Sequence, residues 1–477
     1  MVIVSILILG LILRLVNLNQ SLWLDETVQA ITSKAPFLNL FSELQGDFHP
    51  PLYHFLMWGW AHLFGNGEIA MRLPSVLFGV ATIWFVYKIA GLMNGRKTFP
   101  LIAALLMATA PFHIYYSQEA RMYAFATFTA AFSFYYFLRM ILDKSPNKPA
   151  YIFSTALMLY GDYYGLFGFL AQIIIALILW RKKILKLIPS FLIAAAFFLP
   201  CLPLLYVQLK TGFQATSFLP GWSTLVNLSV IKALPLTFVK FAIGRITIFD
   251  KKIYALAMGI LFLVYGFFLL KGFRFKKKWQ TTKPLLVIWA WLILPVFLAW
   301  VVSIILPNYQ PFRLLFVLPA FYLLLAWGVS SFSSTLAFRL GAVFILLVNL
   351  ICLGVYYQNP YFHREDWRGA TAYIENQNER EKALALLPSH TSHWPYAYYS
   401  QKKVPLVGIA QSFNIVEQKN LEEVILKDKE KIYYIYYLAD LFDPQNLIPN
   451  WLENQKFVKI GEISFNQIRI QEWSRHE

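Results

Sequence analysis

Apolar runs long enough to cross a lipid bilayer recur along most of this chain, and they limit the folds open to it. A membrane-spanning helix needs about 20 mainly apolar residues, or fewer where it lines a cavity. Because 58% of the 477 residues are hydrophobic, a soluble core cannot bury them all. We therefore expect an all-α polytopic membrane protein over residues 1–357, with about eleven transmembrane helices, near residues 2–18, 75–92, 99–115, 122–141, 150–162, 164–180, 187–207, 253–270, 284–306, 312–330 and 338–357.

Basic residues gather in the short loops that follow every second predicted span, for example at Arg96, at residues 181–186 and at residues 271–278. By the positive-inside rule, these loops are cytoplasmic. The N-terminus is then inside and, after an odd number of crossings, the tail from residue 358 is outside. We expect an integral, multi-pass protein of the cytoplasmic (plasma) membrane.

Residues 209–251 form an ambiguous segment, in which an apolar stretch is interrupted by Lys232, Lys240 and Arg245. Counting it as a span would move the basic loop at 271–278 to the outside. We therefore expect an external loop with helices at the membrane interface, where its cations face anionic lipid headgroups.

The net charge of +17 could indicate a nucleic-acid partner, but the basic residues lie in short loops between apolar runs. That placement is typical of membrane topology rather than of a phosphate-binding face, so we expect membrane lipids and no nucleic acid as partners. Cys201 and Cys352 both fall in apolar runs, so neither a disulfide framework nor a thiolate metal site is expected.

From residue 358 the composition becomes polar, with charges of both signs. Apolar residues recur at helical or at alternating spacing in successive stretches of this tail. We expect an extracytoplasmic α/β domain over residues 358–477, with helices at 362–377 and 446–455 and strands at 382–388, 431–440 and 459–473.

The segment 19–74, between the first two spans, carries Asp25, Glu26, Asp47 and His49. Carboxylates beside a membrane face are costly unless water or a substrate meets them there. No acidic residue falls in the middle of a predicted span, whereas an ion-coupled carrier is expected to have one there. We therefore predict a catalytic loop on the outer side of the membrane.

Six short blocks, in their order and spacing, resemble the GT-C superfamily of membrane glycosyltransferases. The resemblance is greatest to the bacterial families 39 and 83, which include protein O-mannosyltransferases and lipid A aminoarabinose transferases. The blocks are RLVNLNQSLWLDE (14–26), DFHPPLY (47–53), RLPS (72–75), YYSQEARMY (115–123), DYYG (162–165) and PFRLLFVLPA (311–320). One departure is Asp162, since relatives often carry a histidine before the Tyr-Tyr-Gly.

The resemblance implies inverting transfer of a sugar from a polyprenyl-phosphate donor lipid to an acceptor hydroxyl at the outer face of the membrane. The acceptor is a lipid, a glycan or a protein. A lipid-linked-sugar flippase or other transporter is the alternative, but it does not explain a carboxylate-rich outer loop.

The resemblance makes Asp25 the general base that takes the proton from the acceptor hydroxyl. The alternative is that Asp25 caps the helix that follows it. Glu26 is the second catalytic candidate, or it supports the first turn of the same helix.

The remaining candidates are expected to bind the donor's phosphate or sugar. His49 and Arg313 resemble the residues that lie near the phosphate in relatives. The alternatives are that His49 is a solvated histidine in the loop before a helix and that Arg313 is a snorkelling membrane anchor. Arg121 neutralises the phosphate and Glu119 contacts the sugar or the arginine, unless the two form a mutual ion pair.

We expect the aromatic residues Tyr163 and Tyr164 to stack on the sugar. The alternative is that they belong to an aromatic belt at the membrane interface. We expect no required cofactor and no metal site. The adjacent acids could hold a divalent ion, but a phosphate leaving group needs cationic donors more than it needs a metal.

Overall fold

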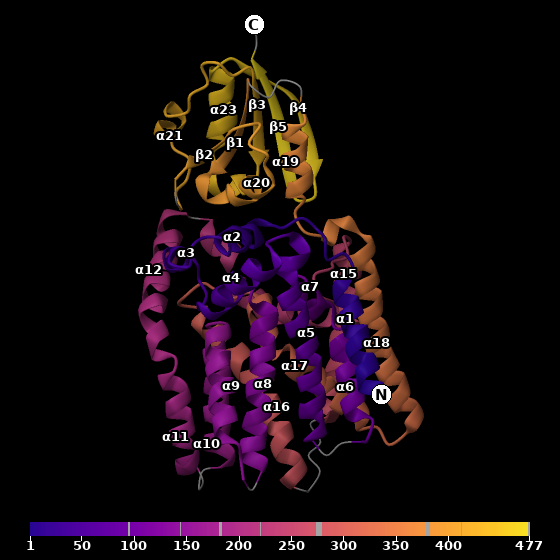
Figure 1. Ribbon diagram of the computed structural model, residues 1–477. Helices are drawn as coiled ribbons and strands as arrows, with labels where there is room; N and C mark the ends of the chain where they lie inside the picture. Colours follow the sequence, from indigo (N-terminus) through magenta and orange to yellow (C-terminus); the bar gives the residue numbers. More distant parts are fainter. Residues whose placement is uncertain are drawn as a thin grey trace.

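The computed structural model describes residues 1–93, 96–143, 145–180, 184–219, 221–272, 279–377, 382–411 and 413–475. It has two parts, a helical bundle and, beyond one end of it, a small domain built on a β-sheet (Figure 1). The bundle ends with α18 and the sheet domain follows it. Residues 181–183 and 273–278, which contribute to the predicted orientation, lie outside the described residues.

Within the described residues, eight helical segments are long and apolar enough to cross a membrane. They are α5 (Glu68–Gly91), α8 (Tyr123–Leu142), α11 (Ile184–Ala196) with η1 (Leu199–Cys201) and α12 (Leu202–Phe218), α13 (Trp222–Val226) with α14 (Val230–Ile243), α15 (Lys251–Gly272), α16 (Trp279–Val302), η2 (Pro311–Val317) with α17 (Leu318–Ser330), and α18 (Thr335–Gln358). The predicted polytopic helical fold is confirmed.

A ninth span is bent. Helices α6 (Phe99–Ala108) and α7 (Pro111–Ser117) meet at 56°, and the break falls just before Pro111, which cannot donate a hydrogen bond to the preceding turn. Three shorter helices, α1 (Val2–Leu15), α9 (Lys148–Gly161) and α10 (Gly165–Leu179), complete the bundle. All eleven predicted spans therefore fall on helices, although several are shorter than a full crossing.

The segment predicted as an external loop, 209–251, differs in part from that prediction. Helix α12 continues the preceding helix as far as Phe218, and α13–α14 is apolar enough to count as a span. However, α14 begins where the Val230 carbonyl accepts a hydrogen bond from Trp300 Nε1 (3.0 Å). It ends just before Arg245, whose guanidinium lies 5.2 Å from the Tyr115 ring centroid. Both ends are near the sheet-domain end of the bundle, so α14 does not cross it.

The predicted catalytic loop consists of three short helices, α2 (Leu24–Thr32), α3 (Asn39–Gly46) and α4 (Leu52–Phe64). They lie between the bundle and the sheet domain (Figure 1). The proline pair at 50–51 fixes the backbone immediately before α4 begins. Indole hydrogen bonds then hold α4 in place, from Trp58 to the Ala35 carbonyl before α3 and from Trp60 to the Ala70 carbonyl in α5.

The sheet has the strand order β2-β1-β3-β5-β4. Its strands are β1 (Ala383–Ser389), β2 (Leu406–Ala410), β3 (Lys431–Tyr436), β4 (Phe457–Phe465) and β5 (Ile468–Arg475). Strands β2, β1 and β3 are parallel, and β5 and β4 are antiparallel additions. The predicted strand at 459–473 is therefore a hairpin, which turns at Gln467 with φ 60°. Strand β2 was not predicted.

Alternating side chains of the strands pack into two cores, one on each face of the sheet. Leu384 and Leu386 belong to one core, and Ala385 and Leu387 to the other. The helices of this domain are α19 (Trp367–Glu375), η4 (His390–Ser392), α20 (Trp394–Tyr399), α21 (Gln418–Glu422), α22 (Ala439–Phe442) and α23 (Leu447–Asn454), while η3 (Pro360–Phe362) packs against the bundle through Phe362.

The sheet domain docks on the bundle through polar contacts. Arg364 Nη1 lies 2.6 Å from Glu119 Oε2, and both side chains are buried. The Tyr399 hydroxyl donates to Glu68 Oε1 (2.6 Å) and accepts from the Leu22 N–H (2.7 Å). These bonds fix the domain over the three short helices.

Candidate active site

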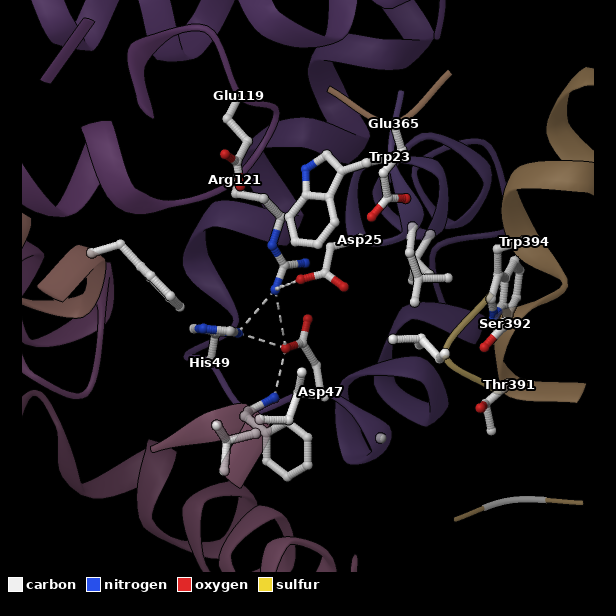
Figure 2. Close-up of a pocket in the computed structure, with 18 of the residues that line it drawn as sticks. Trp23, Asp25, Asp47, His49, Glu119, Arg121, Glu365, Thr391, Ser392 and Trp394 are labelled. Carbon is white, nitrogen blue, oxygen red and sulfur yellow. Dashed lines mark hydrogen bonds and ion pairs between the residues drawn. The ribbon is translucent and has the colours of Figure 1, made fainter. Parts of the chain in front are cut away.

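A cavity of about 770 Å³ lies where the short helices, the bundle and the sheet domain meet. Figure 2 shows part of its lining. The polar residues that line it from the bundle and the short helices include Asp25, Glu43, Asp47, His49, His54, Glu119, Arg121, Arg245, Gln310 and Arg313. Those from the sheet domain and the segment leading to it are Arg364, Glu365, His390, Thr391, Ser392, His393, Trp394, Tyr437 and Gln467.

Arg121 is the centre of a charged cluster (Figure 2). Its Nη2 atom lies 3.8 Å from Asp25 Oδ2, 3.6 Å from Asp47 Oδ1 and 3.2 Å from His49 Nδ1. His49 Nδ1 is also 2.6 Å from Asp47 Oδ1, a distance that fits donation of its hydrogen to that carboxylate. The Asp25 side chain keeps 37% of its surface exposed, against 15% for Asp47, so Asp25 is the more accessible acid.

Local structure explains how these groups meet. Asp25 is in the first turn of α2, and Asp47 terminates α3 in an extended conformation, where it accepts a hydrogen bond from the Phe48 N–H (2.6 Å). His54, in the first turn of α4, places Nε2 3.1 Å from Asp47 Oδ2. Arg121 lies in the turn between α7 and α8.

The two aspartates differ in their electrostatics. Burial acts to raise the pKa of Asp47, but Arg121 and His49 outweigh it and hold this pKa well below its usual range. For Asp25, burial within the cavity raises the pKa, and Arg121 opposes the rise only in part. Asp47 is therefore a fixed anion that orients the cluster, while Asp25 has the greater tendency to take up a proton.

Glu26 does not face the cavity. It is fully buried, and Arg72 donates to both of its carboxylate oxygens, at 2.8 and 2.5 Å. The Ala120 N–H donates to it as well (2.7 Å). Burial alone would raise the pKa of Glu26, but Arg72 outweighs that effect and lowers it. This position fits the alternative, in which Glu26 supports the first turn of α2, and the N-cap of that helix is Trp23 and not Asp25.

Glu119 and Arg121 both line the cavity, but they do not form the mutual ion pair considered above. Arg121 instead pairs with Asp25 and Asp47, and Glu119 pairs with Arg364. Arg364 was not among the predicted site residues. It belongs to the start of the tail, so its contact with residue 119 depends on how the two domains dock.

Arg313 lies in the cavity wall, as the family resemblance implied, and Arg245 lies there too. In the described parts of the chain, neither guanidinium forms an ion pair with a carboxylate. Arg313 donates to the Asn308 carbonyl (3.3 Å). Among the described residues, the cavity therefore contains two cations that form no close ion pair with an acid.

Tyr163 and Tyr164 are placed away from the cavity, contrary to the expectation that they stack on the sugar. The Tyr163 hydroxyl donates to Gln208 Oε1 (2.7 Å), and the Tyr164 hydroxyl donates to the Asn308 carbonyl. Asp162 accepts a hydrogen bond from the Tyr164 N–H (2.8 Å) and so shapes the turn before α10. These residues hold the wall that carries Arg313, through the shared contact at Asn308.

Several cavity residues were not predicted as part of the site. The sequence could have indicated His54, because it follows the proline pair and lies about one helical turn after Pro50. Glu365, Ser392 and Trp394 lie in the tail, and no motif or periodicity of the sequence indicates that they lie near Asp25.

Several buried polar atoms of cavity residues have no hydrogen-bond partner. They include Trp23 Nε1, Glu119 Oε1, Arg121 Nε, Arg313 Nε and Ser392 Oγ. Buried polar atoms are nearly always paired, so a group of unpaired ones in one cavity indicates a site for a polar ligand. Among the described residues, no three His, Cys, Asp or Glu side chains are grouped as a metal site would require. The expectation that no metal is needed stays a prediction.

Part of the chain matches a known enzyme family in sequence. Residues 48–207 match the family described as dolichyl-phosphate-mannose-protein mannosyltransferase. This stretch includes His49 and Arg121 of the charged cluster. Among curated proteins, no sequence matches the chain significantly.

Solved structures share the fold over nearly the whole chain. ArnT from Cupriavidus metallidurans bound to undecaprenyl phosphate matches with a TM-score of 0.59 and 13% identity, over 99% of this chain and 97% of that one. AglB, the oligosaccharyltransferase from Archaeoglobus fulgidus, in complex with an inhibitory peptide and a dolichol-phosphate, gives 0.54 and 14%, over 98% and 74%. The arabinofuranosyltransferase AftD from Mycobacteria gives 0.50 and 11%, over 100% and 41%.

All three structures are GT-C membrane glycosyltransferases, and this chain has their fold. The fold that the six sequence blocks implied is confirmed. The chain is thus a multi-pass membrane protein with the GT-C fold and an appended sheet domain.

Proposed function

We propose that the cavity is the active site of a glycosyltransferase. It transfers a sugar, with inversion, from a polyprenyl-phosphate donor lipid to an acceptor hydroxyl at the outer face of the cytoplasmic membrane. The observation that supports this most strongly is an accessible carboxylate, Asp25, in the same cavity as two cations without acidic partners, Arg245 and Arg313. Such a cavity combines a proton acceptor with binding groups for a phosphate.

The donor phosphate is expected to bind at Arg313 and Arg245, with His49 and Arg121 nearby. Guanidinium groups bind phosphate through charge-assisted hydrogen bonds. They also stabilise the negative charge that develops on the phosphate as it leaves. The undecaprenyl phosphate in the ArnT structure and the dolichol-phosphate in the AglB structure support this choice of donor.

A second cavity, of about 560 Å³, suits the donor's isoprenoid chain. It lies between α4 and α9, and its lining is apolar from Pro149 at one end of α9 to Tyr160 at the other. Pro51 belongs to this lining and is two residues from His49. A lipid whose chain lies along α9 can therefore present its phosphate to the charged cluster.

In the reaction, the acceptor oxygen forms a bond to the anomeric carbon from the face opposite the phosphate. The bond between that carbon and the phosphate oxygen breaks, and its electron pair leaves with the polyprenyl phosphate. The hydroxyl proton moves to Asp25, which then releases it to water in the cavity. Inversion follows from a single displacement of this kind, in which one carboxylate acts as base.

A transfer assay on purified protein tests the proposal. The donors are undecaprenyl phosphates that carry radiolabelled mannose, glucose, galactose or aminoarabinose, and solubilised membrane extract supplies the acceptors. We expect one donor to yield labelled product in detergent solution. A transporter would give no product there and would move labelled lipid only across sealed vesicles, a result that would replace our proposal with the alternative.

A further inference from the structure

The two sides of the cavity differ in their chemistry. The bundle side carries Arg121, Arg245 and Arg313. On the other side, the sheet-domain wall includes Glu365, His390, Thr391, Ser392, His393, Trp394 and Tyr437. Arg364 is the one described arginine or lysine of the lining that comes from this half of the chain, and it forms an ion pair with Glu119. The sheet-domain wall is therefore not built for an anionic ligand.

Glu365 is held firmly in this wall. The residues beside it are fixed, since Asn466 Nδ2 donates to the carbonyls of His363 (3.1 Å) and Arg364 (2.9 Å). Its own carboxylate accepts hydrogen bonds from Trp367 Nε1 (2.8 Å) and from the Tyr437 hydroxyl (3.1 Å). Two neutral donors thus aim a half-buried carboxylate at the cavity.

No described cation forms an ion pair with Glu365, unlike the other buried carboxylates of the cavity. Asp25 and Asp47 have Arg121, and Glu119 has Arg364. An ionised carboxylate has about four acceptor sites, and Glu365 uses two of them for these side chains and one for the backbone N–H of Leu24. Its remaining capacity is available to hydroxyl groups of a ligand.

Ser392 gives an independent indication of a ligand. Its side chain is 1% exposed and lines the cavity, yet Oγ has no hydrogen-bond partner. Next to it, the His393 ring lies 4.6 Å from the Trp394 ring and 4.5 Å from the His390 ring, between centroids. Ser392 and Trp394 face the cavity from the side opposite His49 (Figure 2).

We propose that the sheet-domain wall is the acceptor site and that the acceptor is a saccharide, whose hydroxyls bind Glu365 and Ser392 while its ring packs against Trp394. This inference rests on the proposed function. A sugar combines several neutral hydroxyls with an apolar ring face, and the wall offers a carboxylate, a hydroxyl and an aromatic surface to match them. A phosphorylated acceptor would need cations here.

The test measures binding in nanodiscs by calorimetry, with p-nitrophenyl glycosides of glucose, galactose, mannose and arabinose as probes. We expect saturable binding of at least one glycoside. Glu365→Gln should weaken it about tenfold and Ser392→Ala about fivefold, the ranges for hydrogen bonds to charged and to neutral groups. The matched control, Glu453→Gln on the exposed surface of α23, should leave it unchanged.

A pH series adds a second measurement, the pH dependence of glycoside binding. A purely structural role of Glu365 would not affect it. Burial is the main cause that raises the pKa of Glu365 to about 7, and the charge of Asp25 adds to the rise. The hydrogen bonds from Trp367 and Tyr437 oppose it. Because only the ionised carboxylate accepts on both oxygens, glycoside binding should weaken as the pH falls from about 8 to about 6. It should be independent of pH in Glu365→Gln.

Two results would overturn the inference: equal glycoside affinity in wild type and Glu365→Gln, or saturable binding of a Ser/Thr peptide with none of any glycoside. Both are binding results. Failure of donor cleavage in the transfer assay would instead overturn the proposed function, so the two failures are distinguishable.

Discussion

Asp25 and Glu26 are adjacent in sequence but have opposite environments. Successive residues of an α-helix point in directions about 100° apart, so neighbours cannot share one face. Asp25 faces the cavity and Arg121, while Glu26 faces the interior and Arg72. The sequence identifies the pair, but only the rotation of α2 decides which acid meets a substrate.

Replacing Glu26 should therefore reduce stability rather than remove chemistry. Glu26→Gln leaves Arg72 as a buried cation without its partner, and breaking a buried pair costs about 3–5 kcal/mol. Thermal unfolding in detergent should show a clearly lower midpoint. Asp25→Asn is the control, and an unchanged midpoint for Glu26→Gln would contradict the assignment.

The pH dependence of transfer should report on Asp25. A base acts when ionised, so the rate should fall as the pH drops through the pKa of Asp25, which burial raises above its ordinary value. The acidic limb of the pH–rate profile should therefore lie above the range of an exposed aspartate, near 3.9. A rate that rises toward acidic pH would rule Asp25 out as the base.

The segment between α18 and α19 connects the two domains and completes the cavity. Arg364 pairs with Glu119, donates to the Tyr115 carbonyl (2.9 Å) and places its guanidinium 3.7 Å from the Tyr115 ring centroid. The neighbouring Arg368 pairs with Glu68, but its side chain is 52% exposed. These two arginines should differ widely in what they contribute.

We expect Arg364→Met to loosen the sheet domain, because Glu119 would be left buried without its cation, at a cost of about 3–5 kcal/mol. Hydrogen exchange should then increase in α19 and in the segment before it. Arg368→Met is the matched control and should cost less than about 1 kcal/mol, as exposed ion pairs do. Equal effects of the two substitutions would contradict the importance of the buried pair.

The elements differ in how far the sequence predicts them. Helices of the bundle are found because most of them carry a long apolar run of their own. The turn that makes β4 and β5 two strands rests on one residue, Gln467, in a left-handed conformation that composition does not reveal. The direction of Tyr163 and Tyr164 depends on contacts with α12 and with residue 308, which are distant in sequence.

The sequence predicts site residues only where they lie in short, contiguous blocks. Asp25, His49, Arg121 and Arg313 lie in the family-like blocks, and all four line the cavity. The sheet-domain wall is different, since Glu365 reaches the cavity only after the tail folds and docks. No periodicity or short motif encodes that contact.

For the molecule as a whole, we propose that the cavity and the sheet domain face the outside of the cell. In a variant with Cys201 and Cys352 replaced by serine, single cysteines at Ser145 and Lys427 test this. An impermeant maleimide on intact cells should label the Lys427→Cys protein and not the Ser145→Cys protein until the cells are opened. The reverse pattern would place the cavity on the cytoplasmic side.

The most direct test of the proposed chemistry is transfer by purified Asp25→Asn protein, because this change keeps the size of the side chain and removes the base. With the radiolabelled polyprenyl-phosphate donor that the wild type uses, we expect the rate to fall by at least about 100-fold, with an unchanged unfolding midpoint and unchanged donor binding. Near-normal turnover would contradict the mechanism, since Asp25 could then not be the group that takes the acceptor's proton.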